Sequence, residues 1–191
     1  MGKIVCIDGN IGSGKSTLLE ELTKRGYYVF KEDIGRWGFF LDKFYEDPKR
    51  WGFTLQIAIM NSLCDQFQEM KELCKNNEFV FVERSPETSM IFGKNSHELG
   101  YISHEEFEVY KECFNRFIWY PDVKFFIETN VGVCLNRIQK RGRKCEQNLK
   151  CDYLERIGLG YKKMSFCEYF SGMDSPQQIA DKMLEKLKIL N

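Results

Sequence analysis

Residues 9–17 read Gly9-Asn10-Ile11-Gly12-Ser13-Gly14-Lys15-Ser16-Thr17, and this stretch decides the fold. It has the spacing of a phosphate-binding loop, in which a glycine and four further residues precede Gly-Lys-Ser/Thr. The apolar run at residues 3–7 suits a buried parallel strand, and residues 17–25 suit a helix that ends at Gly26. Glycines let backbone N–H groups turn toward phosphate oxygens, Lys15 can reach the β- and γ-phosphates, and the Ser16 hydroxyl can bind Mg²⁺. The stretch therefore predicts a nucleoside triphosphate site formed by all nine residues.

Length and charge limit the remaining interpretations. The 191 residues suit one domain over residues 1–191, and 28 Lys+Arg balance 28 Asp+Glu. A net charge of zero provides no overall field that would attract nucleic acid or an acidic membrane surface. No apolar run approaches the ~20 residues of a membrane span. We therefore expect neither nucleic acid nor a membrane as a partner.

The cysteines and the start of the chain indicate the cellular compartment. Eight cysteines include no Cys-x-x-Cys pair, and with only two histidines they do not predict a zinc site. Several lie in apolar runs, as reduced thiols do. The first strand begins at Lys3, which leaves no room for a targeting peptide. These features predict a cytoplasmic protein.

A second predicted strand, residues 27–30, runs into Glu32. In open α/β sheets ligands bind beyond the carboxyl ends of strands, so Glu32 stands where chemistry is expected, although a solvated strand-end carboxylate fits as well. The aromatic-rich residues 36–45 follow, including Trp37, Leu41 and Tyr45. Such residues fit a hydrophobic core, and near a nucleotide loop they also suit a planar base.

Residues 54–75 form the clearest amphipathic pattern, and Gln56 lies on its apolar stripe four residues before Met60. A buried carboxamide is costly unless it is paired. Gln56 therefore either faces water at the start of this helix or pairs with the edge of a base in a cleft.

A third predicted strand, residues 79–82, runs into Glu83 and Arg84. This acid and base form either a structural ion pair or a site for metal or phosphate. A fourth strand is predicted at residues 123–127. The following helix ends near Arg137, Arg141 and Arg143, which flank Gly142. Arginine binds phosphate in a bidentate manner, so residues 137–150 are interpreted as an arginine-rich lid rather than a solvated face.

The remaining elements complete the expected fold. Helices are expected at about residues 88–99, from 103, from 152 and from 176, with a last strand at 166–170. Strands alternate with helices along the chain. This alternation predicts an α/β fold of three layers, with a parallel sheet of about five strands and helices on both faces.

Five stretches together resemble the deoxynucleoside kinase family, which includes deoxycytidine, deoxyguanosine and mitochondrial-type thymidine kinases. They are residues 9–17, Lys31–Trp37, Tyr45–Gln56, Glu83–Ser85 and Arg137–Arg143. The similarity spans about residues 3–157 and implies the phosphate-loop kinase fold, with ATP as phosphate donor and Mg²⁺ as cofactor. It also implies a homodimer.

The resemblance assigns a role to each matching residue. Glu32 matches the general base, and Arg84 matches the arginine that steadies it. Glu83 and Ser16 match the groups that hold Mg²⁺, while Lys15, Arg137, Arg141 and Arg143 match the cations around the donor phosphates. The deoxynucleoside would lie against Glu32, Trp37, Leu41, Tyr45, Gln56, Leu63, Arg84, Phe92 and Glu146. In this set Gln56 reads the base, while Tyr45 and Glu146 bind the sugar 3′-hydroxyl.

The residue type at position 63 indicates which base is preferred. Family members that act on deoxycytidine or purines resemble one another in carrying Arg at this position, whereas Leu63 offers no hydrogen bond and leaves room for a 5-methyl group. The expected reaction is transfer of the γ-phosphoryl group to the 5′-hydroxyl of a pyrimidine deoxynucleoside. The second base-selecting position stays open among Glu87, Thr88 and Ser89. The alternative function is that of a nucleoside monophosphate kinase of the thymidylate kinase type.

Overall fold

A computed structural model describes residues 2–143, 146 and 149–190. Five strands lie in this part of the chain: β1 Lys3–Gly9, β2 Tyr28–Phe30, β3 Phe79–Glu83, β4 Val123–Glu128 and β5 Glu168–Ser171. It also contains eight helices: α1 Lys15–Lys24, α2 Ile34–Glu46, α3 Pro48–Leu73, α4 Pro86–Glu98, α5 His104–Phe117, α6 Val131–Arg141, α7 Cys151–Tyr161 and α8 Pro176–Ile189. The predicted alternation of strands and helices is confirmed.

All five strands are parallel and follow the order β2-β3-β1-β4-β5. β1 lies at the centre, and Val5 pairs with Phe81 on one side and Val123 on the other. Since the strands are parallel, the phosphate-binding loop after β1, Glu32 after β2 and Glu83 at the end of β3 meet at one edge of the sheet. This edge positions the site.

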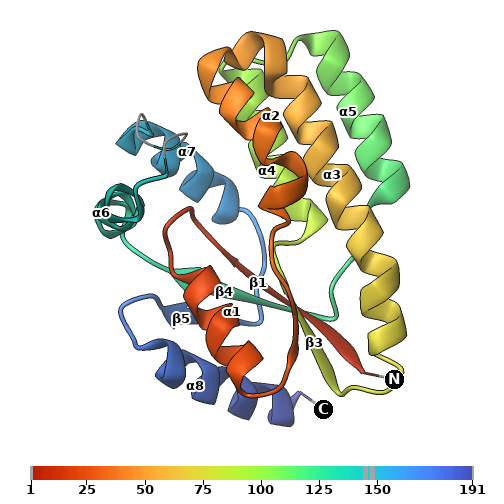
Figure 1. The fold of residues 1–191 in the computed structure, drawn as a ribbon, viewed down its shortest axis with the longest axis vertical. Helices are drawn as coiled ribbons and strands as arrows, with labels where there is room; N and C mark the ends of the chain where they lie inside the picture. Colours follow the sequence, from red (N-terminus) through yellow and green to blue (C-terminus); the bar gives the residue numbers. More distant parts are fainter. Residues whose placement is uncertain (1, 144–145, 147–148, 191) are drawn as a thin grey trace.

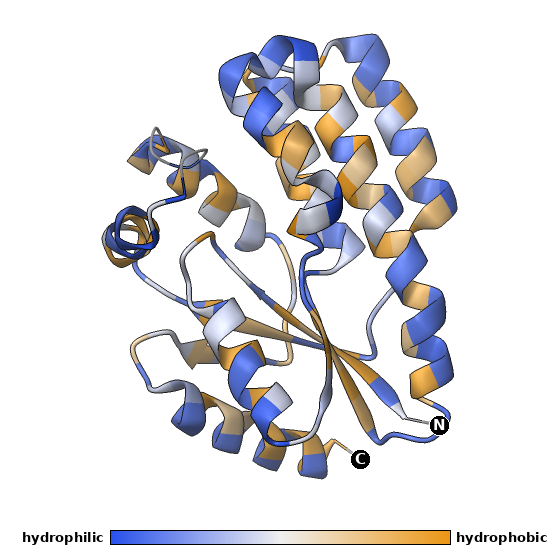
Figure 2. Ribbon diagram, viewed as in Figure 1, coloured by the Kyte–Doolittle hydropathy of each residue, from blue (hydrophilic) through white to orange (hydrophobic). Residues whose placement is uncertain are grey.

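Alternating side chains of the strands bury both faces of the sheet. Val5 and Ile7 of β1 pack into a core with α1 and α8, whereas Ile4 and Cys6 pack into a core with α3. Figure 1 shows α1 and α8 together on one side of the strands. Figure 2 shows apolar strands between helices that are apolar on one face and polar on the other. The expected three layers are therefore confirmed.

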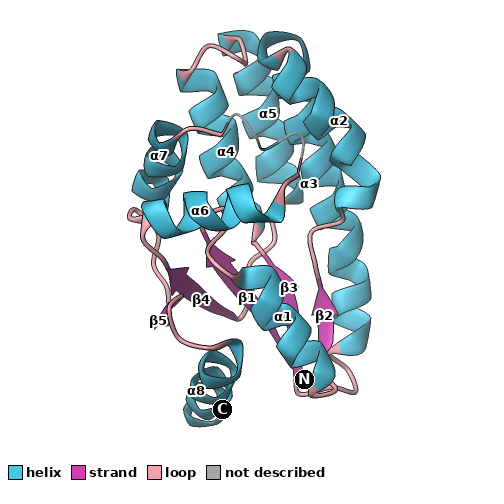
Figure 3. Cartoon of the chain, turned by 60° about the vertical axis from the view of Figure 1, so that its left-hand side comes forward, coloured by secondary structure: helices cyan, strands magenta, loops and turns pink. Residues whose placement is uncertain are grey.

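Helices α2, α4, α5, α6 and α7 stand beyond the carboxyl edge of the sheet, together with the first part of α3, whose last turns cover a face of the sheet. Helix α3 packs against α2, α4 and α5, and α7 packs against α4 and α6. In Figure 3, α6 lies across the top of the strands, below the bundle that contains α4 and α5. Two groups of helices thus border the edge where the phosphate-binding loop lies.

Two features of the α2–α3 region differ from the sequence interpretation. Residues 34–46, whose aromatic composition does not by itself predict a helix, form helix α2, and Asp33 caps this helix by accepting from the Arg36 N–H. Helix α3 begins at Pro48 rather than near residue 54, because Asp47 caps its first turn and proline suits its first position. Gln56 therefore lies two turns inside the helix, so the interpretation that it faces water at a helix start is wrong.

No helix within the described residues combines the length and apolar character that crossing a membrane requires.

Candidate active site

The phosphate-binding loop joins β1 to α1 through glycines with left-handed backbone conformations. Gly12 has φ 78°, and a Cβ there would lie 2.6 Å from the carbonyl oxygen of Cys134. Gly14 has φ 111° and stands at the N-cap of α1. The loop therefore depends on glycine for its shape as well as for close approach. The positive end of the α1 dipole and its first free N–H groups point toward this loop.

Lys15 is buried at the base of the loop. Its Nζ donates to the carbonyl oxygens of Gly9 at 3.0 Å and Asn10 at 2.9 Å. Burial is the main reason that the pKa of Lys15 is lowered to about 8, with the nearby Arg84 cation adding to this effect. The ammonium group is therefore poorly solvated and well placed to gain from a polyanionic partner.

Glu32 and Arg84 meet at the carboxyl ends of β2 and β3. The Nε of Arg84 donates to Glu32 Oε1 at 2.7 Å, and the Arg84 guanidinium lies over the Phe92 ring at 4.9 Å. Its Nη1 also donates to the carbonyl oxygen of Gly9 at 3.3 Å and to the Tyr161 hydroxyl at 2.5 Å. Burial alone would lower the pKa of Arg84, but Tyr161 and the nearby carboxyl groups, Glu32 first among them, raise it, so the group is a permanent cation beside Glu32.

Glu83 lies between the loop and this pair. Its Oε1 accepts from the Ser16 hydroxyl at 3.4 Å and lies 4.0 Å from Lys15 Nζ. Burial raises the pKa of Glu83, and repulsion by Glu32 raises it further. A carboxylate next to a hydroxyl is a donor set that suits Mg²⁺. No cluster of three or more His, Cys, Asp or Glu side chains suited to a metal occurs within the described residues.

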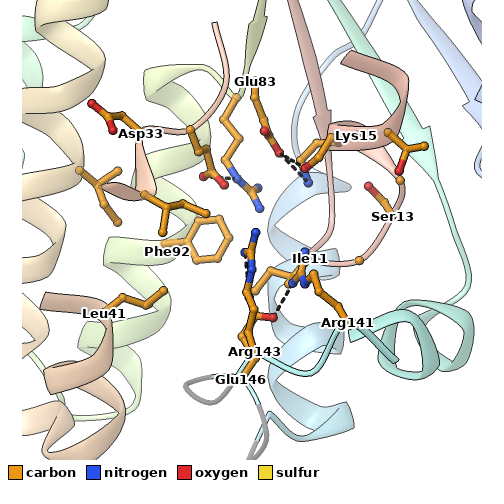
Figure 4. Close-up of a pocket in the computed structure, with 18 of the residues that line it drawn as sticks. Ile11, Ser13, Lys15, Asp33, Leu41, Glu83, Phe92, Arg141, Arg143 and Glu146 are labelled. Atoms are coloured by element: carbon orange, nitrogen blue, oxygen red, sulfur yellow. Dashed lines mark hydrogen bonds and ion pairs between the residues drawn. The ribbon is translucent and has the colours of Figure 1, made fainter. Parts of the chain in front are cut away.

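A cavity of about 810 Å³ runs from the phosphate-binding loop to the α2–α3 helices. Its walls include the residues predicted for the deoxynucleoside, namely Glu32, Trp37, Leu41, Tyr45, Gln56, Leu63, Arg84, Phe92 and Glu146. Figure 4 shows Phe92 and Leu41 on one side of this space and Ser13 and Lys15 on the other. The structure thus brings the residues that are predicted to bind the base, the sugar and the phosphates to one cavity.

Gln56 is a buried polar group on the wall of the cavity that α3 forms. Its residue is 3% exposed, and Oε1 has no hydrogen-bond partner among the described residues. A buried acceptor without a donor is costly, so this oxygen favours a ligand that carries an N–H group. Among residues 87–89, Ser89 is the one that lines the cavity, whereas Thr88 donates to Asp8 and Glu87 binds Lys124.

The arginines of the predicted lid contact protein oxygens. Arg137 donates to the carbonyl oxygens of Ser13 at 3.0 Å and Gly172 at 2.8 Å. Arg141 and Arg143 both donate to the buried Glu146 carboxylate, at 2.5 Å and 3.4 Å. Figure 4 shows Arg141, Arg143 and Glu146 grouped together below the loop. Residues 144–145 and 147–148 of the predicted lid lie outside the described residues.

Several residues that line the cavity are not among those predicted from the sequence. They include Ile59, Ser62 and Tyr153, and also Gly172 and Asp174 in the loop after β5. Ser62 and Ile59 follow Gln56 at helical spacing, which is the signal that could have found them. Tyr153 carries no comparable sequence signal.

A family comparison agrees with this geometry. The sequence profile of the family described as "Deoxynucleoside kinase" matches residues 5–179, which include every site residue discussed above.

Two relatives and one solved structure are similar over most of the chain. The deoxyadenosine/deoxycytidine kinase of Bacillus subtilis (strain 168) is 32% identical over 166 residues, covering 83% of this chain and 75% of the relative. The deoxyguanosine kinase of Dictyostelium discoideum is 32% identical over 166 residues, covering 84% of this chain and 58% of that longer protein. The structure of deoxyadenosine kinase from M. mycoides, with the products dCMP and a flexible dCDP bound, superposes with a TM-score of 0.82. It is 24% identical, covers 97% of this chain and 98% of its own, and shows the fold alone.

Proposed function

The chain belongs to the deoxynucleoside kinase family and is a phosphotransferase, and we propose that it transfers the γ-phosphoryl group of ATP to the 5′-hydroxyl of a pyrimidine deoxynucleoside. The observation that carries this proposal is the single cavity that joins the phosphate-binding loop, the Glu32–Arg84 pair and the buried Gln56. Along this cavity the phosphate-binding loop can bind the donor triphosphate, the Glu32–Arg84 pair can contact a neutral hydroxyl, and Gln56 can hydrogen-bond to a base.

Glu32 acts as the general base in the proposed mechanism. Its carboxylate accepts the proton of the 5′-hydroxyl as the oxygen attacks the γ-phosphorus. Arg84 holds this carboxylate through the 2.7 Å bond from Nε. The guanidinium also offers positive charge where negative charge develops in the transition state.

Lys15 and the arginines neutralise the donor phosphates. Phosphoryl transfer passes through a loose transition state, so positioning and charge neutralisation supply most of the catalysis. In the proposal Arg141 and Arg143 exchange their bonds to Glu146 for bonds to phosphate, while Glu146 and Tyr45 bind the sugar 3′-hydroxyl. Ser16 and Glu83 would hold Mg²⁺, which when bound supplies further neutralisation of phosphate charge.

Gln56 selects the base in the proposal. Its Oε1, which lacks a donor among the described residues, can accept from N4 of cytosine or N3 of thymine, while Nε2 donates to the adjacent acceptor of either ring. Leu63 and Ser89 line the same cavity, and neither offers the base a charged group. These features support a pyrimidine over a purine.

Acceptor specificity tests the proposal directly. We expect kcat/KM for thymidine and deoxycytidine to exceed that for deoxyadenosine and deoxyguanosine by at least about tenfold, which corresponds to one lost buried hydrogen bond. The measurement is ATP-dependent phosphorylation of the four deoxynucleosides. A preference for deoxyguanosine would overturn the pyrimidine assignment. Turnover of thymidine monophosphate alone would favour the thymidylate kinase type instead.

We also propose that the protein forms a homodimer through α3 and α5. These helices pack together, and α5 exposes Val109 and Phe117 on its outer side. Exposed large apolar side chains on one helix favour burial against a second copy. We expect sedimentation velocity to give a mass of two chains, and Phe117→Glu to give a mass of one. A single-chain mass for the unmodified protein would contradict the proposal.

A further inference from the structure

Tyr161 is a buried tyrosine whose hydroxyl contacts the catalytic machinery. It is the last residue of α7 and is 2% exposed. Its oxygen accepts from Arg84 Nη1 at 2.5 Å, and its ring packs against Phe126 at a centroid distance of 5.0 Å. Burial raises the pKa of Tyr161, so the hydroxyl stays protonated and serves as a neutral acceptor for the cation. Tyr161 thus binds the arginine without neutralising it.

The backbone conformation of Arg84 is unfavourable, so contacts with its surroundings, such as the hydrogen bond to Tyr161, must hold the residue in place. Within the described residues it is the one non-glycine residue with a positive φ, at 68°. Left-handed backbone is disfavoured for a residue with a Cβ and persists where the surroundings hold it. The Arg84 N–H donates to the carbonyl oxygen of Ile7 at 3.2 Å, which fixes the backbone but leaves a long side chain to be oriented.

Besides its contact with the Phe92 ring, the guanidinium makes one hydrogen bond to the proposed base and two supporting hydrogen bonds. Nε donates to Glu32, the proposed base, while Nη1 donates to Gly9 O at 3.3 Å and to Tyr161 at 2.5 Å. Of the two supporting bonds, the bond to Tyr161 is the shorter. Among the described residues Nη2 has no acceptor, so it is available to a reacting group. Loss of the Tyr161 hydroxyl would let the guanidinium rotate away from this arrangement.

Helix α7 is also fixed to the phosphate-binding loop. Asn10 Nδ2 donates to the carbonyl oxygen of Leu154 at 2.8 Å. The same helix therefore contacts the donor loop through Leu154 and the catalytic arginine through Tyr161. Helix α7 follows directly after the predicted lid in the chain. A displacement of α7 would therefore affect both the phosphate-binding loop, through Asn10, and the Glu32–Arg84 pair, through Tyr161.

We propose that Tyr161 is a positioning residue that fixes the Arg84 guanidinium so that Glu32 and Nη2 face the 5′-hydroxyl and the transferring phosphoryl group. This inference rests on the proposed function of Glu32 and Arg84. If Tyr161 acts in this way, helix α7, which follows the lid, also contributes to the chemical step.

Replacement of Tyr161 by Phe tests this role. We expect kcat to fall about tenfold, as for loss of one hydrogen bond to a charged group, while KM for the deoxynucleoside stays within about twofold. Phenylalanine keeps the ring and its packing, so the thermal midpoint is expected to stay close to that of the unmodified protein. The matched control is Phe166→Leu, because Phe166 packs on the Tyr161 ring at 6.5 Å without bonding to Arg84. This control is expected to lower the thermal midpoint and leave kcat unchanged.

A double-mutant cycle separates positioning of Arg84 from a general structural effect. In an Arg84→Lys background the hydroxyl has no guanidinium to align, so Tyr161→Phe is expected to change kcat less than about twofold. Full additivity of the two changes, or an unchanged kcat in Tyr161→Phe alone, would overturn the inference. If the unmodified protein phosphorylates no deoxynucleoside, the proposed function fails instead, and the two failures are thereby distinguished.

Discussion

Replacing Glu32 by Gln is expected to lower kcat about a thousandfold while the deoxynucleoside still binds, because a positioned general base contributes about 10²- to 10⁴-fold. Glutamine has nearly the shape of glutamate, and its carbonyl oxygen can still accept from Arg84 Nε, which lies 2.7 Å from the carboxylate in the unmodified protein. It cannot accept the 5′-hydroxyl proton. Steady-state rates with ATP measure the loss, and calorimetric titration with the deoxynucleoside measures the retained binding.

The control for Glu32→Gln is Glu128→Gln. Glu128 is also a carboxylate at the end of a strand, but it is exposed on β4. Removing its charge is expected to leave kcat unchanged. A Glu32→Gln variant that kept more than about a tenth of kcat would show that another group takes the proton, since that loss is below the usual contribution of a base.

The order of strands and helices could be predicted from the sequence because β1, β2, β3 and β4 each contain an apolar run. The last strand, β5, has no such run and begins at Glu168 rather than at residue 166. Helix α2 could not be predicted, since Gly35 and Gly38 weaken its helical propensity and its aromatic residues also suit a core. Asp47-Pro48 does mark the start of α3 in the sequence, because an N-cap residue followed by proline is a start signal for a helix.

The site was predictable where a motif fixes the local backbone and less so where it depends on contacts between distant segments. In residues 9–17 the glycines, which alone adopt the required positive φ without strain, fix the shape of the loop. Which of Glu87, Thr88 and Ser89 lines the cavity depends on the face that α4 turns toward it, and the sequence does not give this orientation; in the structure it is Ser89. Tyr161 lies 77 residues from Arg84 in the chain, and nothing in its local sequence points to that contact. Pairwise contacts of this kind arise from packing, so spacing alone does not reveal them.

Replacing Lys15 by Met is expected to lower kcat/KM for ATP by about a thousandfold or more, because charge neutralisation of the donor is the largest contribution in phosphoryl transfer. Methionine fills a similar volume in the buried position, so the fold is expected to persist. Binding of the deoxynucleoside, whose predicted contacts are Gln56 and Glu32, is expected to be unaffected. Lys24→Met removes the same charge from an exposed position on the same helix and is the control.

The lowered pKa of Lys15 gives this prediction a second, independent readout. Because burial lowers the pKa of this ammonium to about 8 in the free protein, an increasing fraction of the protein carries neutral Lys15 as the pH rises above that value. A bound triphosphate favours the charged form, so binding above pH 8 requires uptake of a proton and the affinity for ATP is expected to fall by up to about tenfold per pH unit. Calorimetry in buffers of different ionisation enthalpy measures this uptake directly. Lys15→Met is expected to abolish the uptake, and a variant that still takes up the proton would show that another group titrates with the donor.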